Sequence, residues 1–102
     1  MPFVKRGTTP LHIFECDIDL RTAVELKIVY SQFDRVIFEK NLSDCTITEE
    51  DVSVNLTQEE TLMLSNDDDL EIEIIVGFPD GSVARSIEVA ACVQDTLYKG
   101  AL

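Results

Sequence analysis

The sequence contains few of the residues from which catalytic and phosphate-binding sites are built. It has one histidine, four glycines and no tryptophan among 102 residues. The lone His12 has no second histidine for a zinc site, and no Cys-x-x-Cys pair replaces it. Glycine-rich phosphate loops and the H-E-x-x-H and G-x-S-x-G patterns are also absent. The sequence therefore predicts a protein that is not an enzyme and that uses no cofactor or metal.

Cysteines and long apolar runs are scarce as well. Cys16, Cys45 and Cys92 are an odd number of widely spaced cysteines, so we expect three reduced thiols. No apolar stretch approaches the roughly 18 residues of a membrane helix, and we expect no membrane partner. Met1 to Pro10 lacks the apolar core of a signal peptide. These absences favour a cytoplasmic protein.

The sequence is also poor in Lys and Arg. Eight Lys and Arg stand against 20 Asp and Glu, a formal charge of −12. Residues 41–84 hold twelve carboxylates and no Lys or Arg, whereas Lys5 and Arg6 lie in a lead without acids. Such a chain lacks the cations that release counterions from DNA or RNA, so no nucleic-acid partner is expected. The acidic stretch is interpreted as a solvated face; the alternatives are a surface for a basic partner or an imitation of nucleic-acid phosphates.

What the sequence does contain is alternation of apolar and polar residues with period two, which indicates half-buried strands. Seven short strands and no long helix predict an all-β fold: a seven-stranded antiparallel immunoglobulin-like β-sandwich without the immunoglobulin disulfide. We expect a flexible basic lead over 1–8, the sandwich over 9–95 and a C-terminal tail over 96–102. The expected strands are Thr9–Cys16, Val24–Tyr30, Arg35–Lys40, Asp44–Ile47, Asp51–Leu56, Leu70–Phe78 and Val83–Val93.

One helical turn interrupts the strands near 57–63. Thr57 and Glu60 have the spacing of a capping box, in which each side chain accepts a hydrogen bond from the other residue's amide. They are therefore interpreted as a structural cap. A tight turn at Pro79-Asp80-Gly81 connects the last two strands.

Apolar residues also fall where the alternation predicts water. In an immunoglobulin-like sandwich the third, sixth and seventh strands share one sheet, so these residues would gather on its outer face. Gathered apolar surface is typical of an interface. The candidate interface residues are Ile37, Ile75, Ala84, Ala90 and Cys92.

Two other groups could carry chemistry. His12 with Asp17 and Asp19 could form an acid–base group, but we expect a histidine at the surface or rim, since no partner is positioned by the pattern. Asp67 to Asp69 with Glu71 offer oxygen ligands for calcium, yet they lack the alternating spacing of an EF-hand loop. A solvated loop is the favoured interpretation, and cation binding stays open.

The same segments resemble known phage proteins. The opening Thr9-Pro10-Leu11-His12-Ile13-Phe14 matches a T-P-x-H-x-F pattern, and Leu56-Thr57-Gln58-Glu59-Glu60-Thr61 matches L-T-Q-E-[DE]-T. With these motifs the chain resembles a set of small, mostly uncharacterised proteins encoded in bacterial prophages. More loosely, it is similar to the N-terminal β-sandwich domains of phage baseplate upper proteins.

The resemblance implies a non-enzymatic phage structural or assembly protein of tail or baseplate type. It implies contacts with other phage structural proteins or with further copies of the chain, in the bacterial cytoplasm or incorporated into a virion. It carries over no catalytic residues. The alternative function is an acidic, nucleic-acid-mimicking inhibitor of a host DNA-binding protein.

Overall fold

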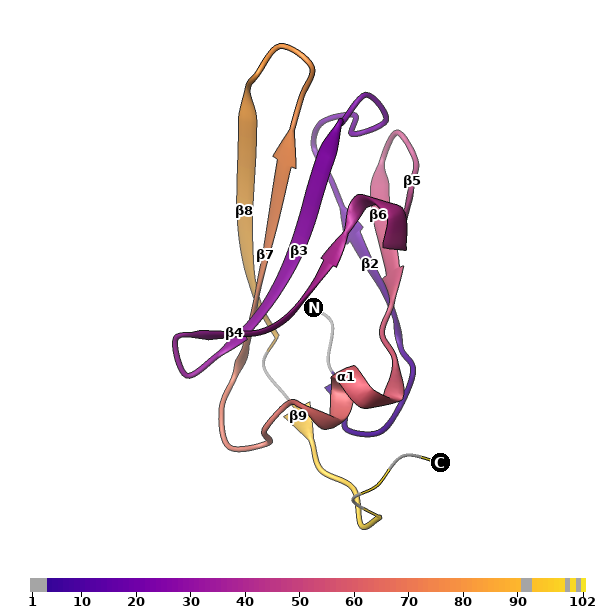
Figure 1. Ribbon diagram of the computed structural model, residues 1–102, viewed down its shortest axis with the longest axis vertical. Helices are drawn as coiled ribbons and strands as arrows, with labels where there is room; N and C mark the ends of the chain where they lie inside the picture. The colour runs from indigo at the N-terminus through magenta and orange to yellow at the C-terminus, as the bar shows by residue number, and fades with distance from the viewer. Residues whose placement is uncertain (1–3, 91–92, 99, 101) are drawn as a thin grey trace.

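The computed structural model describes residues 4–90, 93–98, 100 and 102, of which residues 87–90 are described by their backbone alone. The described chain is mostly β-structure, with one short helix and one 3-10 turn, which confirms the all-β prediction (Figure 1). The elements are β1 (Val4–Lys5), β2 (Leu11–Glu15), β3 (Glu25–Gln32), β4 (Arg35–Asn41), η1 (Leu42–Asp44), β5 (Cys45–Ile47), β6 (Asp51–Asn55), α1 (Gln58–Leu62), β7 (Leu70–Gly77), β8 (Val83–Ala90) and β9 (Val93–Gln94).

Two antiparallel sheets form the sandwich. One has the strand order β2-β6-β5 and the other the order β4-β3-β7-β8. A short parallel pair, β1 with β9, lies near α1 at one end of the molecule (Figure 1). The two sheets therefore differ by one strand.

The core lies between the inner faces of the sheets. Alternate residues of β3 and β7 are buried, because period-two alternation directs every second side chain to one face. The three-stranded sheet contributes Phe14, Val52 and Val54 to the same cluster. From the four-stranded sheet come Leu26, Ile28, Tyr30, Leu70, Ile72, Ile74 and Val76.

The partition of strands differs from the immunoglobulin arrangement in one respect. There the second strand belongs to the sheet opposite the third and sixth. Here β3 lies between β4 and β7 within one sheet. Leu26 is consequently the direct neighbour of Val76, and Ile28 that of Ile74. Cysteines at these positions would be neighbours in one sheet and could not link the two sheets.

The predicted capping box is confirmed at the start of α1. The Thr57 hydroxyl accepts a hydrogen bond from the Glu60 amide at 3.1 Å, and Glu60 Oε1 accepts one from the Thr57 amide at 2.9 Å. The same Glu60 oxygen lies 2.7 Å from Nζ of Lys40 on β4. The cap therefore also attaches the helical turn to the edge of the four-stranded sheet.

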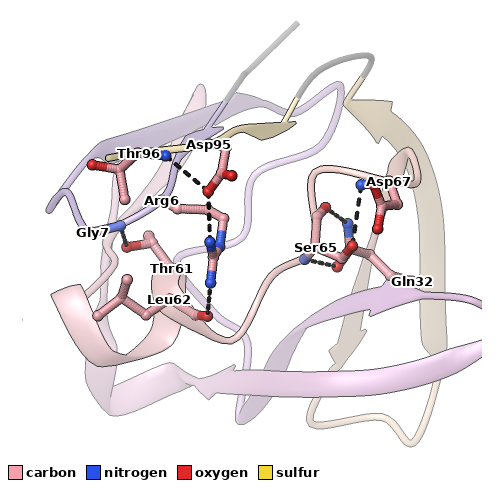
Figure 2. A network of polar contacts seen from close by, with 9 residues as sticks. All are labelled: Arg6, Gly7, Gln32, Thr61, Leu62, Ser65, Asp67, Asp95 and Thr96. Atoms are coloured by element: carbon pink, nitrogen blue, oxygen red, sulfur yellow. Dashed lines mark hydrogen bonds and ion pairs between the residues drawn. The ribbon is translucent and has the colours of Figure 1, made fainter. Parts of the chain in front are cut away.

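The described part of the expected lead, residues 4–8, contacts the rest of the fold. Val4 is buried in the core, and β1 pairs with β9. Arg6 donates to Asp95 Oδ1 at 2.6 Å and to the Leu62 carbonyl at 3.0 Å (Figure 2). Burial of Val4 and the hydrogen bonds of Arg6 thus attach this segment to the α1 end of the molecule.

Candidate functional site

A cleft of about 240 Å³ opens on the flank of the sandwich between β2 and β8. Its floor consists of apolar side chains from β7 and from the loop between β2 and β3. Small and polar residues of β8 form the opposite wall. The lining residues are Glu15, Cys16, Asp17, Ile18, Leu20, Ile74, Val76, Ala84, Arg85 and Ser86.

The cleft exists because four strands face three. The outermost strand, β8, has no counterpart in the three-stranded sheet. The register places Ala84 beside Val76 and Ser86 beside Ile74, on the face that points toward the core. A small and a polar residue at these positions fill little space beside Ile74 and Val76, which stay 8% and 3% exposed. The vacant position is that of a fourth strand in the smaller sheet, next to β2.

The outer edge of β2 adjoins this vacant position. The Cys16 amide donates to Glu50 and the Leu56 amide donates to Pro10, in the same register as the β2–β6 ladder. Residues of an antiparallel strand alternate between the two edges, so the even-numbered residues of β2 bond β6. The backbone groups of Leu11, Ile13 and Glu15 therefore face away from the sheet.

The side chains on this edge are apolar and exposed. Leu11 is 55% exposed and Ile13 54%, on the outer face of the three-stranded sheet, opposite Asn55 and Ser53 of β6. Ile18, in the loop that lines the cleft, is also exposed. Of the β2 residues, Glu15 lines the cleft, whereas Leu11 and Ile13 lie on the outer face of the same strand. We name this edge strand together with the cleft beside its end the β2 flank: Leu11, Ile13, Glu15, Asp17, Ile18 and the apolar cleft residues Leu20, Ile74, Val76 and Ala84.

The rim of the β2 flank is acidic. Glu15 and Asp17 are exposed carboxylates at the mouth of the cleft. Arg85 also lines the cleft, and its guanidinium lies 3.8 Å from Glu73 on β7. Further along the loop, hydrogen bonds from Arg21 lower the pKa of Asp19 below its usual value. The nearby cations thus have acidic partners already, whereas the rim keeps two carboxylates.

The interface residues predicted from the sequence are not brought together. Ile75 does lie on the outer face of the four-stranded sheet, between Lys27 and Arg85. Ile37 instead packs against the core, because a register shift in the β3–β4 ladder leaves it as the extra residue. Ala84 lies on the inner face, in the cleft. The expectations for Cys92 and for the side chain of Ala90 lie outside the described residues.

The alternation of β8 alone predicts the wrong faces for this strand. It favours an arrangement in which the more apolar set of residues faces the core. The register pairs Val83 with Gly77 and Ala84 with Val76, which places Val83 beside the outer face of β7 and Ala84 beside its inner face. Val83 is accordingly exposed. The inward positions of Ala84 and Ser86 were the signal for a cleft, but recognising them requires the long-range register.

His12 is in the core rather than at the surface or rim, so that prediction was wrong. It is 3% exposed, and its Nδ1 lies 2.8 Å from the hydroxyl of Tyr30 on the other sheet. Phe14 contacts the imidazole edge-on, and Phe38 stacks on Tyr30. Burial raises the pKa of the Tyr30 hydroxyl well above its usual range. Because β2 directs even-numbered residues inward, the only histidine serves as a polar core residue.

The remaining candidates are held by structural contacts. The loop that contains Asp67 to Asp69 is fixed by Gln32, whose side chain donates to the Ser65 carbonyl at 2.7 Å and accepts from the Ser65 amide at 2.8 Å (Figure 2). Asp68 Oδ2 accepts from the Phe33 amide. Among the residues that the structure describes, no three His, Cys, Asp or Glu residues are grouped as metal ligands. Cys16 and Cys45 form no disulfide bond, and Cys92 is outside the described residues.

No helix in the described ranges is long and apolar enough to cross a membrane. A scan against protein-family models and a search of curated proteins find no match for this chain.

Proposed function

We propose that this protein is a non-enzymatic structural or assembly component of a phage-type particle, of tail or baseplate kind, that acts through protein–protein contacts. The observation that carries the proposal is the β2 flank. It combines exposed Leu11 and Ile13 on an edge strand with a cleft beside the end of the same strand, on a protein of charge −12. Exposed apolar side chains near a cleft on an otherwise highly charged protein are typical of a docking site. The resemblance to prophage proteins supplies the setting.

The nucleic-acid-mimic alternative is less well supported. A mimic needs carboxylates spaced along a surface like phosphates. Several carboxylates of the acidic stretch accept hydrogen bonds from turns and caps instead. Asp44 binds the Asn41 amide, Asp80 binds Ser82, and Glu60 binds Thr57. These groups contribute to local structure and are separated along the fold.

Deletion of the gene from an inducible prophage that carries it tests the proposal. We expect normal induction and lysis, but few or no complete particles by negative-stain electron microscopy. Expression of the wild-type chain in trans should restore them. Particles of normal number and shape from the deletion strain would contradict a structural or assembly role, and they are what a nucleic-acid mimic would leave.

A further inference from the structure

We infer that the β2 flank accepts an extended, positively charged segment of another polypeptide, which adds to β2 as a fourth strand of the smaller sheet. This inference rests on the proposed function and names the partner chemistry and the binding mode. Three independent features of the flank support it: the backbone groups of the edge, the side chains on its two faces, and its charge.

The backbone of β2 is available for pairing. Leu11, Ile13 and Glu15 direct their N–H and C=O groups away from β6, and in the described part of the chain no strand pairs with this edge. An added strand would bond these groups in a regular ladder, as in β-strand addition. The flank therefore offers a row of directional contacts as well as apolar surface.

Among the edge strands, β2 is the one with the least protection. Native edges are usually blunted by shortness, positive charge or bulges. The opposite edge, β5, has three residues, and β4 carries Arg35 and a register shift. β8 carries Arg85 at its exposed start. β2 has five residues, and its only charge is Glu15 at the end.

An added strand would be covered on both faces. Its inward side chains would lie over Ile74, Val76 and Ala84, at the position that the smaller sheet leaves vacant. Its outward side chains would flank Leu11 and Ile13 as cross-strand neighbours. Both faces therefore favour aliphatic residues, and one segment would bury the cleft and the exposed edge together.

The charge selects a cationic partner. Glu15 and Asp17 lie at the mouth of the cleft, and Arg85 already has Glu73 nearby. A second copy of this chain would bring another formal charge of −12 to the same rim, and like charges oppose association. A segment with Lys or Arg near the Glu15 end would instead be attracted by these carboxylates. The occupant is thus a basic, apolar strand of a different protein.

The test uses the full chain and a designed peptide. The probe is a capped peptide of alternating valine and threonine with a lysine at each end. Binding is followed by NMR titration and by amide hydrogen exchange. We expect saturable binding, with exchange at Leu11, Ile13 and Glu15 slowed by about tenfold or more at saturation. A peptide N-methylated on alternate backbone nitrogens, which cannot form a ladder, should not slow it.

Variants test the backbone edge and the acidic rim separately. Ile13→Pro removes an amide that faces away from β6, so it should abolish peptide binding, whereas Ile13→Ala keeps the amide and most of the binding. The double variant Glu15→Lys/Asp17→Lys changes two exposed residues and should weaken the affinity for the lysine peptide by about tenfold. A peptide with glutamate at each end should bind wild type less tightly than the lysine peptide.

Several outcomes would overturn the inference. Absence of binding, or binding without slowed exchange at Leu11, Ile13 and Glu15, would exclude strand addition at this edge. Equal affinity for the lysine and glutamate peptides would exclude a cationic partner. Slowed exchange in a concentration-dependent dimer without peptide would identify a second copy as the occupant instead. The deletion experiment measures particle assembly and does not involve the peptide. The proposed function is therefore tested independently of this inference.

Discussion

His12 on β2 and Tyr30 on β3 join the two sheets through a buried contact of 2.8 Å between Nδ1 and the phenolic oxygen. Phe14 contacts the imidazole edge-on and Phe38 stacks on the phenol ring. A polar contact in such a setting favours one relative position of the sheets, because a shifted packing would leave both groups in an apolar environment.

Loss of this contact should destabilise the fold. Tyr30→Phe keeps the ring and removes the hydroxyl, so the imidazole loses this partner at a cost of about 1–3 kcal/mol. Urea denaturation measures the free energy of unfolding. Tyr98→Phe is the matched control, since Tyr98 is exposed and its change should have little effect. Equal effects of the two substitutions would show that the buried contact adds nothing.

The raised pKa of Tyr30 predicts a loss of stability at alkaline pH. The unfolded chain releases this proton near the ordinary pKa of about 10, whereas burial keeps the folded hydroxyl protonated. Stability should therefore be complete below pH 10 and fall above it, by up to about 1.4 kcal/mol per pH unit. Tyr30→Phe should lack this component. Parallel pH profiles of wild type and variant would contradict the prediction, and the Cys45 thiol, common to both, cancels in the comparison.

The capping box makes a second, local prediction. Thr57→Ala removes the acceptor for the Glu60 amide and should cost about 1 kcal/mol. Thr57→Ser keeps the hydroxyl and should retain most of the stability. The urea midpoints of the three proteins report the difference. A Thr57→Ala midpoint equal to that of wild type would mean that the cap does not stabilise the turn.

The ion pair of Lys40 and Glu60 should respond unequally to removal of each partner. Their side chains are 10% and 18% exposed. Glu60→Gln leaves the ammonium nearly buried without its counter-charge, whereas Lys40→Met replaces it by an apolar group of similar length. We therefore expect Glu60→Gln to lower the free energy of unfolding more than Lys40→Met. The reverse order, measured by urea denaturation, would contradict this assignment.

Duplex DNA should not bind at moderate salt. Arg6, one of the two cations of the lead, is paired with Asp95, and residues 41–84 supply carboxylates alone. A fluorescence-anisotropy titration with labelled duplex at several salt concentrations measures this. Salt-dependent binding at micromolar protein would contradict it, because such binding requires cations that displace phosphate counterions.

Local signals in the sequence were sufficient for part of the fold. The alternation of β7 and the Thr57–Glu60 box each depend on residues close in sequence, and both are confirmed. The inner and outer faces of β8 depend on its register with β7, and a slip of one residue exchanges them. Local alternation does not determine this register, so Ala84 was placed on the wrong face. The position of β3 between β4 and β7, and the shift at Ile37, likewise depend on distant pairing.

The Arg6 contacts determine where the first and last described strands lie relative to the cleft. Arg6 and Asp95 bring both ends of the described sandwich together beside Leu62. This junction lies at the α1 end, away from the β7–β8 turn (Figure 1). The cleft is lined by Val76 and Ala84, which lie next to that turn. The Arg6–Asp95 pair and the cleft are therefore at opposite ends of the long axis, so a change in one should leave the immediate surroundings of the other unaltered.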